Sequence, residues 1–564
     1  MREIGLLLGS FDPPHIGHAY SAINALSTGV VNEVWIVPAW QNPWKTKSTP
    51  FAFRKTLVQY LVDDIGNDMI KMNPIEGELK PQYTYQLIEF LIKDNPDTHF
   101  HIVGGTDVAE DIKKWKNSEY ILEHCGLIKT DRSIINVSST YIREQLKNGK
   151  STFPFLTKSV EESLILNNIY KMILSILDTD LYKFSMSYAY FSLYPLAEGT
   201  FKFNDRNKED WRKHPEFIEK MKKAIKKIDK YSLKGKERDW CIKHIKYIPQ
   251  TYWEWLQTFR FDPSKINFWI DENGVFQCEV TDVMYKVTLY EIIILSLYSE
   301  IRNEILYGSA DDTKVAKILM DKINYANANN VPFADFGTRR RFSPSTQELC
   351  IQTIKKHSNT CKATSNVYLA MKYDLVPTGT MAHEWIMFHA SCFGYKRANY
   401  LALEDWIQVF KGDLGTALID TYTTDSFLRT LTKQQALLLQ GFRQDSGDEF
   451  EVGNKIIARL KEFGIDPRTK VIVFSNALDI NKAKRIKDYF EGKCKVAFGI
   501  GTNITCDPGI EDFKAPNIVM KLSKCRLSPK DPWEDSIKIS DDLGKHMGNE
   551  KEFEIAKHEL NIAA

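Results

Sequence analysis

The stretch GSFDPPHIGH, residues Gly9–His18, decides the fold of the first part of the chain. It follows an apolar strand predicted at Glu3–Gly9 and precedes a helix predicted from about Gly17. In an α/β sheet, the loop after the first strand is where bound phosphates meet backbone N–H groups and a helix N-terminus. His15 and His18 can direct two imidazoles at one phosphate from this loop. The alternative is an ordinary strand-to-helix turn that carries two solvated histidines.

The segments that follow alternate between strand and helix patterns. Further strands are predicted at 33–38, 99–104, 126–129 and 134–137, and helices at 54–64, 83–93, 138–147 and 158–167. Strands that alternate with helices indicate a parallel α/β sheet. We therefore predict a Rossmann-like first domain over residues 1–170. The sequence has no GxxxxGK[ST] motif, so this domain is not a P-loop protein.

Length and composition set the frame for the rest of the chain. Its 564 residues, at about 150 residues per domain, predict three or four domain-sized units. With 75 Lys and Arg against 73 Asp and Glu, the net charge of +2 gives no global field that would attract nucleic acid. Nine cysteines without a CxxC pair predict reduced thiols and a cytoplasmic location. Neither a signal peptide nor a membrane-spanning segment is expected.

The remaining residues divide into two parts by their pattern. Residues 171–331 are rich in Lys, Trp and Tyr and are predicted to be mixed α+β. Residues 332–564 contain a barrel and a C-terminal extension, because eight strand-like pieces occur there, mostly separated by helical lengths. These pieces are PFADFGT, ATSN, PTGTMAHE, ALIDTYTT, QGFRQDSG, KVIVFSN, VAFGIGT and NIVMKL. Polar or glycine residues at the strand ends are typical of a (β/α)8-like barrel with its ligands at the C-terminal face.

Those strand ends carry groups suited to phosphate and ribose. Arg339–Arg341 form a cluster for pyrophosphate, and the two carboxylates of Asp445–Asp448 suit ribose hydroxyls or Mg²⁺. Gly499–Thr502 could wrap a monophosphate through backbone N–H groups, and His383 supplies a titratable nitrogen. Each feature has an ordinary alternative, such as a solvated arginine face or a structural histidine. Their occurrence together on the strands of one barrel favours a ligand site.

The HxGH sequence in this setting resembles the nucleotidylyltransferase superfamily, and GSFDPPHIGH is similar to bacterial-type nicotinate mononucleotide adenylyltransferases. The segments SSTYIR at 138–143, Gly105–Asp107 with Trp115, and Pro38–Lys45 resemble further motifs of that family. The resemblance implies that His15 and His18 act in catalysis. It implies ATP binding by Gly9, Ser10, Phe11, His18, Ser138, Ser139, Thr140 and Arg143, and mononucleotide binding by Lys45, Thr84, Asp107 and Trp115.

Two departures from that family leave the mononucleotide pocket open. Trp44 stands where the family usually has histidine, and the 126–136 segment is shorter than usual. The implied reaction is in-line attack of a mononucleotide phosphate on the α-phosphorus of ATP, with Mg²⁺ as cofactor. Because the nucleophile belongs to the substrate, the protein mainly positions the reactants and stabilises charge.

Residues 177 to about 550 closely resemble nicotinate phosphoribosyltransferase, a type II phosphoribosyltransferase. The segments that carry the likeness are LDTDLYK (177–183), DFGTRRR (335–341), TSN (364–366), GTMAHE (379–384), DTY (420–422), RQDSGD (443–448) and GIGT (499–502). That family joins nicotinate to 5-phosphoribosyl 1-pyrophosphate. Its ATP stimulation runs through transient phosphorylation of a histidine, which falls on His383.

The likeness also implies roles for individual residues. Phe336 and the partner subunit's Tyr182 would enclose the pyridine ring, which requires a homodimer with a shared site. Arg443 would lie beside the ring, Asp445 would hold the ribose, and His383, Arg443 and Asp445 would be catalytic. The nicotinate and phosphoribosyl pyrophosphate set comprises Tyr182, Phe336, Arg339, Thr380, His383, Asp420, Arg443, Asp445, Gly499, Gly501 and Thr502.

Together the two resemblances predict a bifunctional enzyme of NAD biosynthesis. The C-terminal part would make nicotinate mononucleotide, and the N-terminal part would adenylate it to nicotinate adenine dinucleotide. Its partners would be small molecules, namely nicotinate, phosphoribosyl pyrophosphate, ATP and nicotinate mononucleotide. Two alternatives remain: nicotinamide as the base, which would give nicotinamide mononucleotide and NAD, or a nucleotide-sensing protein with weak turnover.

Overall fold

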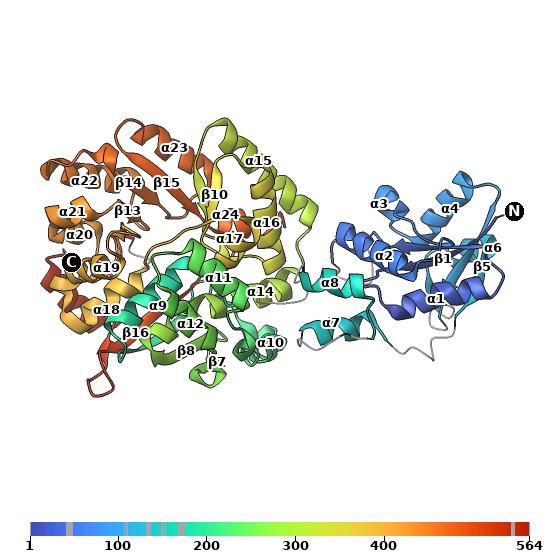
Figure 1. Ribbon diagram of the computed structural model, residues 1–564, viewed down its shortest axis with the longest axis horizontal. Coiled ribbons are helices and arrows are strands. Elements are labelled where there is room, and N and C mark those ends of the chain that lie inside the picture. The colour runs from blue at the N-terminus through green and yellow to red at the C-terminus, as the bar shows by residue number, and fades with distance from the viewer. Residues whose placement is uncertain are drawn as a thin grey trace. The chain divides into compact units, whose positions relative to one another are not determined.

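The computed structural model divides into two compact units, Met1–Lys171 and Met172–Ala564 (Figure 1). The structure describes residues 2–40, 49–105, 108, 111–130, 137–147, 152, 154–166, 175–542 and 548–562. No helix in these ranges is long and apolar enough to cross a membrane.

The first unit is built on a parallel five-stranded sheet. Its strands are β1 (Arg2–Gly9), β2 (Glu33–Pro38), β3 (Ile70–Met72), β4 (Thr98–Gly104) and β5 (Cys125–Lys129), in the order β3-β2-β1-β4-β5. All the pairings are parallel. The order reverses direction between β1 and β4, which is the switch point where doubly wound folds bind ligands beyond the carboxyl ends of the strands.

Helices cover both faces of this sheet (Figure 1). They are α1 (Ile16–Ser27), α2 (Phe51–Ile65), α3 (Ile75–Leu79), α4 (Thr84–Asp94), α6 (Ser118–His124), α7 (Ser139–Lys147), α8 (Lys158–Leu166) and the 3₁₀ helix η1 (Ile112–Lys114). One apolar cluster packs α1, α2 and α8 on one face, and a second packs α4 and α6 on the other. The predicted Rossmann-like fold is confirmed, although most of the predicted strand 134–137 lies outside the described residues.

The second unit contains a parallel seven-stranded sheet that forms part of a barrel. Its strands are β9 (Phe333–Asp335), β10 (Cys361–Thr364), β11 (Val376–Pro377), β12 (Thr416–Leu418), β13 (Gly441–Gln444), β14 (Val471–Phe474) and β15 (Lys495–Ile500). The order is β11-β10-β9-β15-β14-β13-β12. The two edge strands are linked through the hydroxyl of Thr380, which donates to the carbonyl of Thr416 at 3.0 Å.

The eighth strand-like piece, NIVMKL, does not belong to this barrel. It forms β16 (Ile518–Arg526), which pairs antiparallel with β6 (Glu198–Asp205). The resulting sheet runs β17 (Glu534–Asp535), β16, β6, β8 (Phe276–Val283) and β7 (Ile266–Ile270). The prediction was wrong because an apolar run indicates a buried strand without indicating which strand it pairs with. The α+β segment and the barrel segment thus share a sheet.

Helices surround both sheets of the second unit. They are α9 (Leu181–Leu193), α10 (Glu216–Ile225), α11 (Gly235–His244), α12 (Gln250–Thr258), α13 (Met284–Val287), α14 (Tyr290–Tyr307), α15 (Asp312–Ala328), α16 (Pro344–His357), α17 (Val367–Tyr373), α18 (His383–Phe393), α19 (Tyr395–Phe410), α20 (Thr424–Thr430), α21 (Lys433–Leu438), α22 (Glu449–Glu462), α23 (Ile480–Phe490), α24 (Thr502–Thr505) and α25 (Glu550–Leu560). Short 3₁₀ turns are η2 (Trp211–Lys213), η3 (Ile228–Lys230), η4 (Pro263–Lys265), η5 (Thr338–Arg340) and η6 (Pro467–Thr469).

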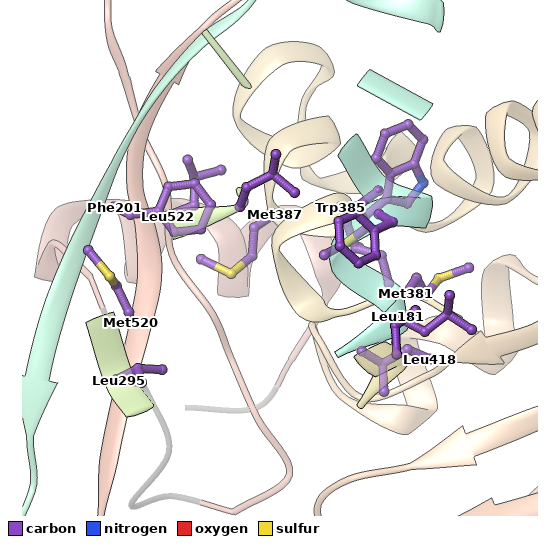
Figure 2. Packing of buried hydrophobic residues seen from close by; sticks show 14 of the residues in the cluster. Leu181, Phe201, Leu295, Met381, Trp385, Met387, Leu418, Met520 and Leu522 are labelled. Carbon is purple, nitrogen blue, oxygen red and sulfur yellow. The ribbon is translucent and has the colours of Figure 1, made fainter. Parts of the chain in front are cut away.

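One continuous apolar core joins the two sheets of this unit. Figure 2 shows Met387 of α18 beside Leu522 of β16 and Phe201 of β6, and Met381 close to Leu418 of β12. Burial of these side chains away from water stabilises α18 where it lies between the sheets. The N-terminal end of α18, which carries His383, is therefore fixed by packing on both sides.

Candidate active sites

The loop after β1 holds the two histidines of the first unit. His15 is buried at the N-cap of α1, and its ring stacks on the ring of His18 with a centroid distance of 3.8 Å. The backbone N–H of His15 donates to His18 Nδ1 at 3.1 Å. In the neutral His18 ring the proton then lies on Nε2, which is the form that donates to a phosphate oxygen.

The start of α7 lies against the same loop. Ser139 Oγ donates to the carbonyl of Pro13 at 2.9 Å, and the Arg143 guanidinium donates to the carbonyl of Asp12. Arg143 also donates to Thr140 Oγ1 at 2.9 Å. The structure therefore brings the SSTYIR segment and the HxGH loop together at the carboxyl end of the sheet.

Arg54 is a residue of this site that the sequence analysis missed. Its buried guanidinium donates to the carbonyls of Ser10 at 2.7 Å, Thr49 at 2.7 Å and Trp40 at 3.1 Å. It thereby joins the loop after β1 to the loop after β2. The available signal was an arginine at a position of α2 that the helical pattern assigns to the buried face.

The remaining residues predicted for the site of the first unit lie in several different segments. Phe11 is buried against the His18 ring, with a centroid distance of 4.8 Å. Thr84 is the first residue of α4, and Trp115 packs beside the apolar cluster under α4 and α6. Lys45, Asp107 and Trp44 lie outside the described residues. Gly9 ends β1, and Ser138 Oγ accepts the N–H of Tyr141 at 3.2 Å.

A cleft in the second unit opens where the barrel strands end. It is lined by Tyr182, Glu291, Arg339, Ala382, His383, Glu384, Met387, Leu418, Arg443, Asp445, Val519, Met520, Lys521 and Leu522. Five of the predicted residues are in this set: Tyr182, Arg339, His383, Arg443 and Asp445. The cleft also takes four residues from β16, so both sheets of the unit build it.

His383 is the first residue of α18, and each nitrogen of its ring has a partner. Nδ1 lies 3.0 Å from Thr421 Oγ1, while Nε2 lies 2.9 Å from Lys538 Nζ and 3.3 Å from Asp445 Oδ2. Because an ammonium only donates, Nε2 accepts from Lys538 and the neutral ring carries its proton on Nδ1. Burial and the charge of Lys538 lower the pKa of His383 to about 4, so the ring is neutral at pH 7.

Asp445 and Arg443 form the neighbouring pair. Arg443 Nη2 lies 3.5 Å from Asp445 Oδ1, and Ser475 Oγ donates to the same oxygen at 2.9 Å. Burial raises the pKa of Asp445, but the charges of Arg443 and Lys538 outweigh that effect and hold this pKa well below its usual range. The Arg443 guanidinium also lies 5.7 Å from the centroid of the Phe336 ring. One arginine therefore lies close to both a carboxylate and an aromatic ring.

The three consecutive arginines separate into different roles. Arg339 lines the cleft, whereas Arg341 is fully buried and binds Asp178 through two contacts of 2.7 Å. Arg340 Nε donates to the carbonyl of Ile518 at 3.2 Å. The expectation of a three-arginine pyrophosphate cluster was wrong, because the turn η5 points successive side chains in different directions. Arg341 instead holds the LDTDLYK segment onto the barrel.

Two lysines of the cleft region were missed by the sequence analysis. Lys521 lines the cleft from β16, and Lys538 contacts His383 from the C-terminal extension. Burial and the charges of Lys538, Arg206 and Arg339 lower the pKa of Lys521 to about 6. The only signal in the sequence was a lysine next to apolar residues, in NIVMKL and in SIKIS.

Gly499 has a steric role that the sequence did not reveal. A Cβ at this position would lie 2.4 Å from the Phe336 ring, so only glycine allows the ring to lie there. A Cβ at Gly501 would lie 2.9 Å from the carbonyl of Phe336, and Thr502 begins α24. The GIGT segment therefore packs closely against the end of β9.

The DSGD turn and the TSN segment contribute caps as well as site residues. Asp448 caps α22 by accepting the N–H groups of Phe450 and Glu451 at 3.0 and 2.9 Å. It is therefore not the second ligand-facing carboxylate that the sequence predicted. Asn366 caps α17 through Leu369 N at 2.9 Å.

Asp420 is buried close to His383. Its Oδ2 accepts from Ser446 Oγ and lies 3.8 Å from Lys538 Nζ. Its Oδ1 is buried and has no hydrogen-bond partner within the described ranges. His383, Asp420 and Asp445 together place three ligand atoms within 4.8 Å of one another.

A network of buried charges lies at the wall of the cleft and comprises Lys183, Glu291 and Glu384. Lys183 Nζ contacts Glu291 and lies 2.6 Å from Glu384 Oε2 and 3.3 Å from Thr288 Oγ1. Burial raises the pKa of Glu384, while the charge of Lys183 opposes that shift. Lys183 therefore ties α9 to the first turn of α18, next to His383.

Tyr182 lines the cleft of its own chain, beside Arg339. Its position is fixed by the preceding residues, since Leu181 N donates to the carbonyl of Ser365 at 2.8 Å and Asp180 accepts from Ser365 Oγ at 2.6 Å. The contribution of the partner subunit's Tyr182 to the site stays a prediction.

Comparison with known proteins gives the chain its family. The model of the nicotinate phosphoribosyltransferase (NAPRTase) family matches residues 331–564, that of the NAPRTase N-terminal domain matches residues 177–299, and a cytidylyltransferase-like model matches residues 6–145. The nicotinate phosphoribosyltransferase of Desulforapulum autotrophicum is 38% identical over 384 residues, which cover 68% of this chain and 97% of that protein.

The chain is also similar to solved structures. The crystal structure of nicotinate phosphoribosyltransferase from Porphyromonas gingivalis has a TM-score of 0.67 and 40% identity, and the match covers 69% of this chain and 99% of that one. Plasmodium falciparum nicotinic acid mononucleotide adenylyltransferase in complex with NaAD matches 30% of this chain and 98% of its own, at 20% identity and a TM-score of 0.27.

The parallel half-barrel and its cleft define the second unit as a type II phosphoribosyltransferase fold. The chain belongs to the nicotinate phosphoribosyltransferase family and is a fusion, with a nucleotidylyltransferase-like domain at its N-terminal end.

Proposed function

We propose that the second unit joins nicotinate to 5-phosphoribosyl 1-pyrophosphate to form nicotinate mononucleotide. The observation that carries this proposal is the gathering of Arg339, His383, Arg443 and Asp445 around one cleft. The names of the relatives support the choice of substrates, because the protein from D. autotrophicum is a nicotinate phosphoribosyltransferase.

Each group of the cleft suits one part of these substrates. Pyrophosphate departure leaves a cation-like anomeric carbon, so neutralisation of the leaving group by Arg339 lowers the barrier. Asp445, which is ionised at pH 7, accepts ribose hydroxyl protons. The Phe336 ring and the Arg443 guanidinium form a stacked surface for the pyridine ring and its carboxylate.

His383 suits the role of a transient phosphoryl acceptor from ATP. The acceptor must be an unprotonated nitrogen, and the low pKa of His383 keeps the ring neutral at pH 7. Nε2 is the nitrogen without a proton, and the Lys538 ammonium beside it can stabilise an incoming phosphoryl group. ATP is thus a substrate of this unit as well as of the first.

Mg²⁺ fits the carboxylates beneath His383. The buried Oδ1 of Asp420 lacks a protein donor among the described residues, and a hard cation that prefers oxygen ligands would satisfy it. Asp420 and Asp445 would hold the ion together with the pyrophosphate of the substrate. When bound, Mg²⁺ would neutralise charge on the leaving pyrophosphate.

We further propose that the first unit transfers the adenylyl group of ATP to nicotinate mononucleotide. The proposal rests on His15, His18 and the start of α7 meeting at the switch point of the sheet. His18 Nε2 would donate to a phosphate oxygen, while Arg143 and the N–H groups at the start of α7 would bind the ATP phosphates.

A single assay tests both activities. The full chain is supplied with nicotinate, phosphoribosyl pyrophosphate, ATP and Mg²⁺, and the mononucleotide and dinucleotide products are measured by chromatography. Parallel reactions with nicotinamide, and with each mononucleotide added directly, report the base preference of each unit. Turnover of nicotinamide in place of nicotinate would contradict the proposed substrate. A homodimer with a shared site is also proposed, and sedimentation of the full chain tests it.

A further inference from the structure

Three side chains gather at the amino end of the sheet of the first unit, away from the HxGH loop. Glu3 lies on β1, and His99 and His101 lie on the neighbouring strand β4. Glu3 Oε2 is 3.0 Å from His99 Nδ1 and 2.6 Å from His101 Nε2. The three ligand atoms all lie within 4.8 Å of one another. None of the activities proposed above uses this cluster.

The strand pairing builds this cluster on one face of the sheet. Glu3 is the register partner of His99, and His99 and His101 are two residues apart, so all three side chains emerge on the same side. His101 in turn pairs with Gly126 on β5. A Cβ at Gly126 would lie 2.1 Å from His101 Nδ1, so glycine at this position leaves the space that the ring occupies.

We propose that Glu3, His99 and His101 bind a divalent transition-metal ion of the Zn²⁺ class. Two imidazoles and one carboxylate are a ligand set that Zn²⁺ takes with one position left open. The side chain of His101 is 10% exposed, against 33% for Glu3 and 43% for His99, so an ion can reach the cluster from solvent.

Metal binding requires only a rearrangement of protons at this cluster. Because a carboxylate only accepts, Nδ1 of His99 and Nε2 of His101 carry the protons in the hydrogen bonds to Glu3. On binding, each ring moves its proton to the other nitrogen and presents its lone pair to the ion, while Glu3 exchanges two N–H donors for one cation. No oxidant or other reactant is needed.

The location gives the ion a structural role. It would link β1 to β4, the two strands that flank the switch point of the sheet. Glu3 and Gly9 are separated by six steps of about 3.3 Å, so the cluster is roughly 20 Å from the HxGH loop along β1. The ion should therefore raise the thermal stability of the first unit and should not take part in its chemistry.

Titration of the full chain with Co²⁺ tests the site, because Co²⁺ bound by nitrogen and oxygen ligands in a low-symmetry site absorbs visible light. The variants are Glu3→Gln, which keeps the shape of the side chain, His99→Ala, and Gly126→Ala, which displaces a ligand without removing it. His124→Ala is the matched control, since this exposed histidine of the same unit lies outside the cluster. Circular dichroism reports whether each variant is folded.

We expect the wild-type chain and His124→Ala to bind one more Co²⁺ than Glu3→Gln, and Zn²⁺ to displace it. A change in a residue that orients a ligand costs about 10–100-fold in affinity, so Gly126→Ala should weaken binding by that factor and His99→Ala by at least as much. Equal binding by the wild type and folded Glu3→Gln would overturn the proposal, as would the absence of visible bands. If the variants other than His124→Ala do not fold, a Zn²⁺-dependent rise in the melting temperature of the first unit of the wild type, resolved by calorimetry from the transition of the second unit, supports the site, and no such rise overturns it.

Discussion

The two candidate sites of this chain lie at the carboxyl ends of parallel sheets and differ in the contacts that hold them together. In the first unit, backbone carbonyls and loop N–H groups provide most of the contacts, as at Arg54 and Arg143. In the second unit, buried and half-buried charges face one another around His383, Asp445 and Lys183.

This difference follows the chemistry proposed for each cleft. Adenylyl transfer uses a nucleophile that the substrate supplies, so backbone positioning of two phosphate-bearing molecules is the main requirement. Phosphoribosyl transfer develops charge on both the sugar and the leaving group, so the protein must hold fixed charges in place. The carboxyl end of a parallel sheet can therefore be held in shape by hydrogen bonds to the backbone or by charged side chains.

The largest effect should come from breaking the charged framework of the second unit. Arg341→Met would leave Asp178 as a buried, uncompensated carboxylate, and the loss of one partner of such a pair costs about 3–5 kcal/mol. Calorimetry should show the transition of the larger unit at lower temperature, with that of the smaller unit unchanged. Arg339→Met is the matched control: it should abolish phosphoribosyl transfer and retain stability. A loss of stability in both variants would contradict the assignment of Arg341 to a structural ion pair and of Arg339 to the cleft.

The next largest effect should show that the two proposed reactions depend on different histidines. His18→Ala removes a proposed phosphate donor and should lower adenylyl transfer by about 10²–10³-fold, while phosphoribosyl transfer is retained. His383→Ala should instead uncouple ATP hydrolysis from mononucleotide formation. Each half-reaction is measured with its own substrates on the full chain, with His124→Ala as control. If either substitution stopped both reactions in folded protein, the two-site model would be wrong.

A smaller effect should be the uptake of a proton by Lys521 when the substrate binds. Because the pKa of Lys521 is lowered to about 6, the side chain is mostly neutral in the free protein at pH 8 and should become protonated when an anionic pyrophosphate binds. Calorimetric titrations in buffers of different ionisation enthalpy should reveal uptake of at most one proton per site. Since the unfolded chain holds that proton between pH 6 and the ordinary lysine pKa, stability should also rise with pH in this window. Lys521→Met should remove both effects, and unchanged uptake would assign the proton elsewhere.

The smallest effect should come from the steric role of Gly499. In Gly499→Ala, the new Cβ would meet the Phe336 ring, so the ring must shift, and a displaced pyridine surface should raise the KM for nicotinate by about tenfold. Adenylyl transfer should not change. Gly235→Ala is the control, because a Cβ there meets nothing within 4 Å. An unchanged KM would indicate that the Phe336 ring does not contact the base.

Local pattern was enough to predict much of the fold. The strand, loop and helix from Glu3 to Ser27 are contiguous, so periodicity and the HxGH motif located them correctly. The partner of β16 could not be predicted, because β6 is more than 300 residues away and an apolar run does not indicate which strand it pairs with.

Side-chain direction explains the site residues that the sequence did not predict. Adjacent arginines at 339–341 look alike in sequence, yet the turn η5 directs one into the cleft and another into the core. Lys521 and Lys538 are isolated lysines on apolar segments, and only the pairing of those segments brings them near His383. The motifs recognised in sequence therefore located the cleft but not the charges that surround it.

The pairing of β16 with β6 has a consequence for synthesis on the ribosome. A chain emerges from its N-terminal end, so every strand that the structure describes in the first unit is available once residue 129 is made. The sheet of the second unit begins with β6 but lacks its interior strand until residues 518–526 are made. During that interval one edge of β6 is unpaired, which is a state prone to pairing with other chains. We expect that the first unit folds during translation and that the second waits for its C-terminal end.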